Sequence, residues 1–189
     1  MRFLFIEKEI PYMGVELSPH WIYDKTDIQG DAVVSFVGEC RVELENMVDL
    51  QDVKAKDSIY SPKMLNFIAE FFDDDLEKAI YRQRLLITAM KEELESAGIP
   101  DHVIRQGDDL YHVDHTGVKR KMTVSIATKS IVSTLIHAGI NIRTEGTPVK
   151  TAGLAEFDID PATFASRVME RFILEIEDIR IARSKVRPV

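Results

Sequence analysis

The sequence predicts an α+β fold, a mainly antiparallel mixed sheet flanked by helices. Segments with the apolar spacing of helices lie toward both ends of the chain, and the segment 103–142 between them alternates as strands do. No internal repeat and no long linker rich in Gly, Ser or Pro interrupts this order. At 189 residues, the chain suits a single domain spanning 1–189.

The first sixty residues are predicted to contain two strands and one helix. An apolar strand is expected over 2–6. Ser18-Pro19 has the form of an N-cap followed by proline at the first helical position, so a helix is expected to begin there. A buried strand is expected over 32–37, ending at Gly38. Residues 39–60 have mixed polarity and low periodicity, and no element is predicted there.

Two helices are predicted in succession in the middle of the chain. Ser61-Pro62 repeats the cap-and-proline pattern, which predicts a helix from there through Phe71. A second helix is predicted over 76–97, because its apolar residues fall on one helical stripe. The breaker Gly98-Ile99-Pro100 is expected to end this helix.

The alternating segment predicts a hairpin and a further strand. The strands 109–113 and 118–128 are expected to pair around the turn 114–117. The next strand, 131–142, is long enough to bend or bulge at Gly139.

The last predicted element is a helix that runs from the cap Asp160-Pro161 to about Arg183. Its expected buried face consists of five apolar residues: Phe164, Val168, Phe172, Ile176 and Ile179.

The composition argues against several classes of protein. A net charge of −8, from 24 Lys and Arg against 32 Asp and Glu, repels phosphate backbones and so argues against nucleic-acid binding. No apolar run approaches the roughly 18 residues of a membrane span, and we expect a cytoplasmic protein. The single cysteine excludes an internal disulfide and a cysteine-built zinc site, and no metal site is predicted. The frequency of two-fold assemblies favours a homodimer.

Two successive predicted strands each have an apolar face and a face of small, hydrogen-bonding residues. The first strand alternates Lys121, Thr123, Ser125 and Ala127 with Met122, Val124 and Ile126, and the second places His137, Gly139 and Asn141 opposite Ile136, Ala138, Ile140 and Ile142. Small polar residues with glycine are typical of a cavity floor, so we expect these two polar faces to share one hollow and contact a ligand. The alternative is that they pack against a helix.

Charged residues flank the predicted hairpin. Arg105, Asp108 and Asp109 precede the turn, and the basic run 119–121 follows it. A cation beside a polar cavity suits the binding of a phosphate or carboxylate and stabilises the negative charge that develops in acyl or phosphoryl transfer. The alternative is a set of cross-strand ion pairs that contribute little.

The same segments carry a resemblance to known proteins. Gly107-Asp108-Asp109-Leu110, followed after the hairpin by 121–127, resembles the signature of biotin and lipoate protein ligases. The stretch 136–142 is similar to the next strand of lipoate ligases, which has a His-Gly step. Over nearly its full length the chain resembles a largely archaeal family of uncharacterised proteins, the domain of unknown function 366. Its matching stretches are 30–49, 107–142 and 159–161.

The resemblance implies a class II synthetase-like, biotin/lipoate protein ligase-like fold and a site on the polar strand faces. In the ligases, the lysine after the hairpin contacts the carboxylate and phosphate of an acyl-adenylate, and Lys121 matches it. Asp109 matches the aspartate beside the bound acyl-adenylate. The resemblance thus implies a small carboxylate or acyl donor as partner, ATP as cofactor, and Lys121 and Asp109 as catalytic residues.

The chain also departs from the ligase pattern. In place of the ligases' glycine-rich segment, which encloses the acyl-adenylate, it has 34–42. Gly38 remains there, Cys40 and Arg41 follow, and the resemblance makes these three candidate ligand-binding residues. The glycine three residues after the lysine is Val124, and the asparagine before the aspartate is Asp108. These departures favour an alternative function, a non-catalytic binding or scaffold protein that kept the fold.

Two single residues have a functional and a structural interpretation each. Cys40, next to the cation Arg41, is a candidate nucleophile for acyl transfer without ATP, and otherwise a small buried apolar residue. His137 is a candidate general base, and otherwise a structural hydrogen-bonding residue.

Overall fold

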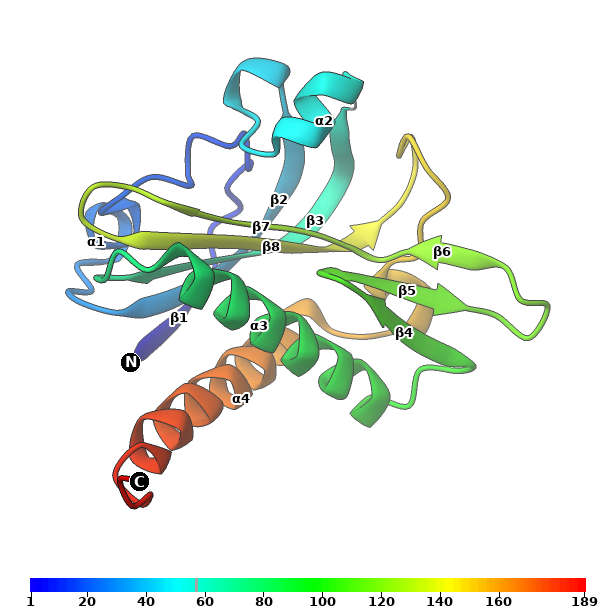
Figure 1. Cartoon of the computed structure of the whole chain (residues 1–189). Coiled ribbons are helices and arrows are strands. Elements are labelled where there is room, and N and C mark those ends of the chain that lie inside the picture. Colours follow the sequence, from blue (N-terminus) through cyan, green and yellow to red (C-terminus); the bar gives the residue numbers. More distant parts are fainter. Residues whose placement is uncertain (57) are drawn as a thin grey trace.

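Two sheets organise the chain in the computed structural model, which describes residues 1–56 and 58–189 (Figure 1). The larger sheet contains, in order across it, β1 (Arg2–Ile6), β2 (Ala32–Val42), β3 (Ile59–Phe71), β8 (Thr134–Arg143) and β7 (Thr123–Lys129). The pair β1–β2 is parallel and the other pairs are antiparallel. The predicted α+β class with a mainly antiparallel mixed sheet is therefore confirmed.

The smaller sheet is the hairpin region. It contains β4 (His102–Gln106), β5 (Asp109–Val113) and β6 (Lys119–Lys121), all antiparallel. The predicted turn is present, with the Gly117 amide donating to the Asp114 carbonyl at 2.9 Å. The predicted strand 118–128 is two strands, because Met122 leaves the small sheet for the large one. Its amide donates to the Leu110 carbonyl, and its carbonyl accepts from the Asn141 amide.

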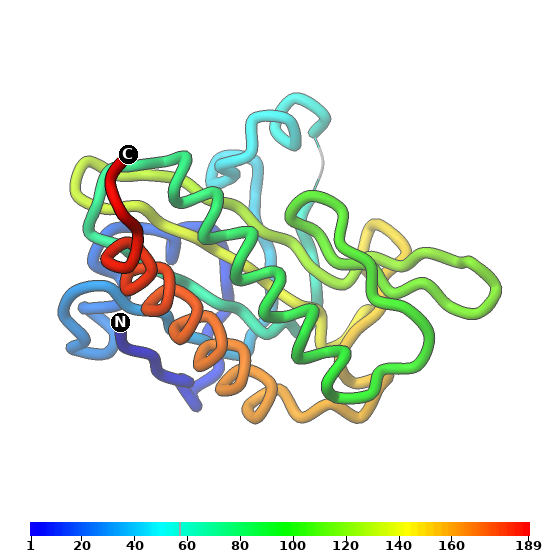
Figure 2. The backbone as a smooth tube through the Cα atoms, turned by 60° about the horizontal axis from the view of Figure 1, so that its bottom comes forward, coloured from blue at the N-terminus to red at the C-terminus, as the bar shows by residue number. Residues whose placement is uncertain are grey.

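Two long helices cover one face of the larger sheet, and both lie close to where the sequence predicts them. The helices α3 (Leu76–Ser96) and α4 (Pro161–Ala182) lie side by side across it (Figure 2). Asp75 and Asp160 cap them through the amides of Lys78 and Thr163. Phe71 of the sheet meets Phe172 of α4 edge-on, with ring centroids 6.3 Å apart. This face is closed by a continuous apolar core.

Shorter elements cover the opposite face of the larger sheet. These are α1 (Trp21–Thr26), the 3₁₀ turn η1 (Leu44–Asn46) and α2 (Leu50–Ala55), while a second 3₁₀ turn, η2 (Leu154–Phe157), precedes α4. A second, smaller apolar cluster lies beneath the covering segments and includes Tyr12, Trp21 and Phe36. Among the described residues, no helix is both long and apolar enough to span a membrane.

The helix predicted over 61–71 is wrong, because this segment is the central strand β3. A strand buried on both faces has apolar residues at nearly every position, so its period of two disappears from the sequence. Pro62 is tolerated in β3 because the β2–β3 ladder is irregular there, with a register shift between Gly38 and Cys40.

The strand predicted to end at Gly38 continues to Val42 as β2. The N-terminal segment runs beside this extension, and the Ile10 amide donates to the Val37 carbonyl at 2.9 Å. A Cβ on residue 38 would lie 1.9 Å from the Ile10 carbonyl oxygen, so only glycine permits this approach.

The irregularity predicted at Gly139 is also misplaced. The ladder is regular at Gly139, which pairs with Val124 and Asn66. The register of β3 against β8 shifts between Lys63 and Met64 instead.

Candidate functional site

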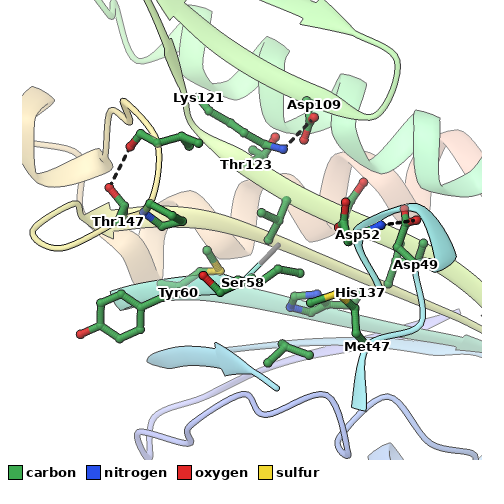
Figure 3. A pocket seen from close by; sticks show the side chains of 18 of the residues that line it. Met47, Asp49, Asp52, Ser58, Tyr60, Asp109, Lys121, Thr123, His137 and Thr147 are labelled. Carbon is green, nitrogen blue, oxygen red and sulfur yellow. Dashed lines mark hydrogen bonds and ion pairs between the residues drawn. The ribbon is translucent and has the colours of Figure 1, made fainter. Parts of the chain in front are cut away.

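A cavity of about 580 Å³ opens on the face of the larger sheet that α3 and α4 do not cover. Strands β7 and β8 form its floor, the segment with η1 and α2 forms one wall, and the loop around Thr147 forms another (Figure 3). Its volume falls within the range of about 300–1,000 Å³ that is usual for small-molecule sites. The floor is apolar where Met64, Val124 and Ile126 line it.

The register of β7 against β8 corrects the expectation that two polar faces share this hollow. Ser125 pairs with Ala138, and Ile126 pairs with His137. Because directly paired residues point to the same side of a sheet, the small face of β7 lies with the apolar face of β8, toward the helices. His137 and Asn141 line the cavity from the other side, next to Val124 and Ile126. The alternative interpretation, helix packing, therefore applies to Ser125, which α3 contacts through Gln83, although Ser125 also reaches the edge of the cavity.

An ion pair stands at one side of the cavity. The Lys121 ammonium lies 2.9 Å from an Asp109 carboxylate oxygen, and both side chains line the cavity (Figure 3). Burial raises the pKa of Asp109, and its hydrogen bond with Lys121 opposes that rise. The backbone holds Lys121 on two sides, since its amide donates to the Lys150 carbonyl and its carbonyl accepts from Ala152. The hairpin thus brings the two predicted catalytic residues together.

A hydrogen-bond network from α3 holds Asp108 and Ser125 at the cavity's edge. The Gln83 amide donates to Asp108 at 2.9 Å and to the Ser125 hydroxyl at 2.7 Å. The Arg84 guanidinium lies 2.8 Å from the other Asp108 oxygen. Both predicted residues line the cavity, and helix residues occupy part of their hydrogen-bonding capacity.

A stack of two rings lies at the far side of the floor. Tyr12 from the N-terminal segment covers the His137 imidazole, with centroids 3.6 Å apart and planes 8° apart. The His137 Nε2 atom lies 3.1 Å from the Asn66 side-chain oxygen. Burial lowers the pKa of His137 to about 3, so the ring is neutral at physiological pH. A proton-accepting role as general base is unfavourable for this ring.

Asn141 is a polar residue on the floor of the cavity. The residue is 5% exposed and lines the cavity, and its side chain has no hydrogen-bond partner among the described residues. Its backbone amide donates to Met122, which follows Lys121 directly, so Asn141 lies at the Lys121 end of β8. Its side-chain amide atoms are not among the fully buried ones without a partner, so they are accessible from the cavity, where a ligand or water can satisfy them.

Five predicted ligand residues do not line the cavity. Gly38 lies against Ile10, Gly139 makes room for the Met64 side chain, Cys40 is buried, and Arg41 pairs with Glu39 at 3.2 Å. The exposed Arg105 donates to the carbonyl of Gly107. Burial raises the pKa of the Cys40 thiol to about 12, which opposes a nucleophilic role.

The cavity walls contain residues that the sequence did not single out. They come from the N-terminal segment, from the stretches 46–56 and 58–60 and from the loop after β8: Tyr12, Met47, Asp49, Asp52, Lys56, Tyr60, Thr147 and Thr151. Of these residues, Asp49 could have been found from the sequence, because aspartate is a preferred helix N-cap and Asp49 caps α2 by accepting from the Gln51 amide at 2.7 Å. Carboxylates outnumber ammonium groups around the cavity, where Lys56 joins Lys121. Within 1–56 and 58–189, no three His, Cys, Asp or Glu side chains are arranged to hold a metal ion.

The fold is similar to that of biotin and lipoate protein ligases. The biotin protein ligase of Aquifex aeolicus in complex with biotin and ATP gives a TM-score of 0.60 at 15% identity, covering 92% of this chain and 70% of that one. A bipartite lipoate protein ligase of Thermoplasma acidophilum gives 0.57 at 17% identity, covering 93% and 83%. At these identities the likeness establishes the fold, and the ligase-like prediction is confirmed.

Two relatives are similar in sequence as well. An uncharacterized protein of Methanocaldococcus jannaschii is 40% identical over 165 residues, which cover 84% of this chain and 72% of that protein. A protein of unknown function from Pyrococcus horikoshi is 39% identical, with a TM-score of 0.91 and complete coverage of both chains. The family model described as a domain of unknown function, DUF366, matches residues 1–187. The chain therefore belongs to the DUF366 family.

Proposed function

We propose that this protein binds a small organic carboxylate, or its acyl derivative, in the cavity and activates it or transfers its acyl group. Lys121 contacts the carboxylate or the oxyanion that develops from it. Asp109 positions the ammonium group at 2.9 Å. The observation that carries the proposal is this ion pair beside an apolar floor within a cavity of about 580 Å³.

The two ends of such a ligand would interact with different parts of the cavity. An apolar body gains free energy by covering Met64, Val124 and Ile126, at roughly 25 cal/mol per Å² of buried apolar surface. The carboxylate needs a charged donor, and Lys121, about one-third exposed, supplies it while remaining tied to Asp109. In acyl transfer, the same ammonium group stabilises the charge on the tetrahedral intermediate.

The residues present do not form a cradle for the phosphates of ATP. The Ile10 backbone occupies the space above Gly38, and Asp108 adds a carboxylate near Lys121. We therefore assign no step to a nucleotide, and these observations favour acyl transfer from a donor that is already activated over activation of the free carboxylate by ATP. These observations favour a second candidate function, a binding protein that takes up the carboxylate without transforming it.

The test is calorimetric titration with a series of linear carboxylic acids, comparing the wild type with Lys121→Met. Removing a charge-assisted hydrogen bond should weaken binding by about 10- to 100-fold. Lys119→Met is the matched control, since Lys119 is on the same strand, is exposed and does not line the cavity. Equal affinity in the two variants would contradict the proposal.

A second assay separates the two candidate functions. The acids that bind are supplied with ATP, and the exchange of pyrophosphate is followed; the corresponding acyl thioesters are supplied separately, and acyl release is followed. Turnover that Lys121→Met abolishes supports the enzyme. Binding without turnover of either kind supports the binding protein.

A further inference from the structure

The hydrogen bonds around His137 determine which ring nitrogen carries the proton. The Asn66 amide nitrogen donates to the Met64 carbonyl at 3.3 Å, which orients the amide. The Asn66 oxygen then faces His137 Nε2 at 3.1 Å and must accept from it. In a neutral imidazole the proton therefore lies on Nε2, and Nδ1 carries a lone pair.

This lone pair is left without a partner. His137 is 3% exposed and lines the cavity, and its Nδ1 has no hydrogen-bond partner within the described part of the chain. The stacked Tyr12 ring holds the imidazole plane in place. Nδ1 is not among the fully buried polar atoms without a partner, so it is accessible from the cavity, and water or a ligand group there is expected to satisfy it.

The neutral state of the ring is built into its surroundings. Asn66 is fully buried beside it, and burial lowers the pKa of His137 to about 3. Tyr12 is also neutral, because burial raises the pKa of its hydroxyl. Nδ1 is thus a fixed acceptor for a neutral donor, and it does not serve as a partner for an anion.

The position of His137 places this acceptor far from Lys121. Asn141 marks the Lys121 end of the floor, and four residues of strand, roughly 13 Å, separate it from His137. Figure 3 shows Lys121 on one side of the cavity and His137 on the other. Val124 lies between the two ends and contributes an apolar surface.

We propose that the ligand of this cavity carries an N–H or O–H donor at the end opposite its carboxylate, and that His137 Nδ1 accepts from it. The substrate class is then a carboxylic acid with a distal amide or hydroxyl group, roughly six to ten bonds away from the carboxyl carbon. This inference rests on the proposed function, which supplies the carboxylate end, and it makes His137 a specificity-determining residue.

The test compares two ligands that differ in the distal donor. Suberamic acid ends in a primary amide, and monomethyl suberate has the same chain length but ends in an ester that only accepts. We expect the wild type to bind suberamic acid about 10-fold or more tightly by calorimetry, because the ester leaves Nδ1 unsatisfied. Pimelamic and azelamic acids, one carbon shorter and longer, set the optimal span.

Protein variants locate the effect. His137→Phe keeps an aromatic ring under Tyr12 but removes the acceptor, so it should bind both ligands equally. His137→Gln is the second variant, since its side-chain oxygen restores an acceptor and should keep part of the preference. Lys121→Met should weaken the binding of both ligands by the same factor, so the preference for suberamic acid over monomethyl suberate should remain.

The outcomes separate this inference from the proposed function. If neither these acids nor octanoate bind, both proposals fail. If the acids bind and Lys121→Met weakens their binding, but the ester binds as tightly as the amide, the proposed distal donor is disproved and the proposed function stands. A preference that persists unchanged in His137→Phe also overturns the role of His137. Because the ligand comparison is made on the wild type, it decides the matter even where a variant fails to fold.

Discussion

The two faces of the larger sheet are covered in different ways, and the difference explains where the cavity lies. On one face, the long helices α3 and α4 present continuous apolar stripes that close over the sheet. On the other, an extended N-terminal segment and short elements such as α2 cover only part of the surface. Long amphipathic helices fill space efficiently, whereas short irregular segments leave a hollow between their backbones and the floor.

Phe172→Ala, on the face that α3 and α4 close, is expected to cause the largest loss of stability. Phe172 is fully buried against Phe71, so its loss should destabilise the protein by about 3–5 kcal/mol. Ile126→Ala on the cavity face is the control, and it should cost clearly less because Ile126 is only partly buried. Urea unfolding measures both, and equal losses would mean that the two faces are equally packed.

A second prediction concerns the two glycines that approach neighbouring groups closely. Gly38→Ala should cost about 2–3 kcal/mol, since the new Cβ meets the Ile10 carbonyl oxygen, which belongs to the backbone. Gly139→Ala should cost about 1 kcal/mol or less, because the Cβ meets the end of the flexible Met64 side chain. Urea unfolding of the two variants tests this order, and the reverse order would show that the N-terminal segment moves freely.

The smallest effect on stability is expected for Asp109→Asn at the cavity rim. Burial raises the pKa of Asp109 in the folded protein, so wild-type stability should decrease as the pH rises from the ordinary value of 3.8 through the raised one. The variant should lack this decrease in urea unfolding between pH 3 and 6. It should also bind carboxylates a few-fold more weakly at pH 7, because Lys121 loses the partner that positions its ammonium group. Tighter binding would instead show that Asp109 competes with the ligand for Lys121.

The parts of the fold that depend on local signals could be predicted from the sequence. Asp75 and Asp160 cap their helices through neighbouring amides, and both helices lie where periodicity places them. The pairing of Lys121 with Asp109 could also be predicted, because a hairpin brings nearby residues together. The strand β3 could not be predicted, since burial on both faces removes the alternation of apolar and polar residues that identifies a strand.

The parts of the site that depend on distant contacts could not be predicted. Tyr12 stacks on His137 across more than a hundred residues of sequence, and no local pattern indicates that contact. The pairing of β7 with β8 reversed the expected relation of their polar faces, because alternation along a strand leaves its register against a neighbour undetermined. Gly38 is explained by the close approach of the Ile10 backbone, a contact between segments that no local pattern indicates.

The change of sheet at Met122 has a consequence for selectivity. Lys121 belongs to the small sheet through β6, whereas the floor with His137 belongs to the large one. Under our proposal that one ligand contacts both Lys121 and His137, the length of that ligand depends on the angle between the two sheets, which meet at Met122. A relative with a different angle between these sheets would then select longer or shorter acids with the same contacting side chains.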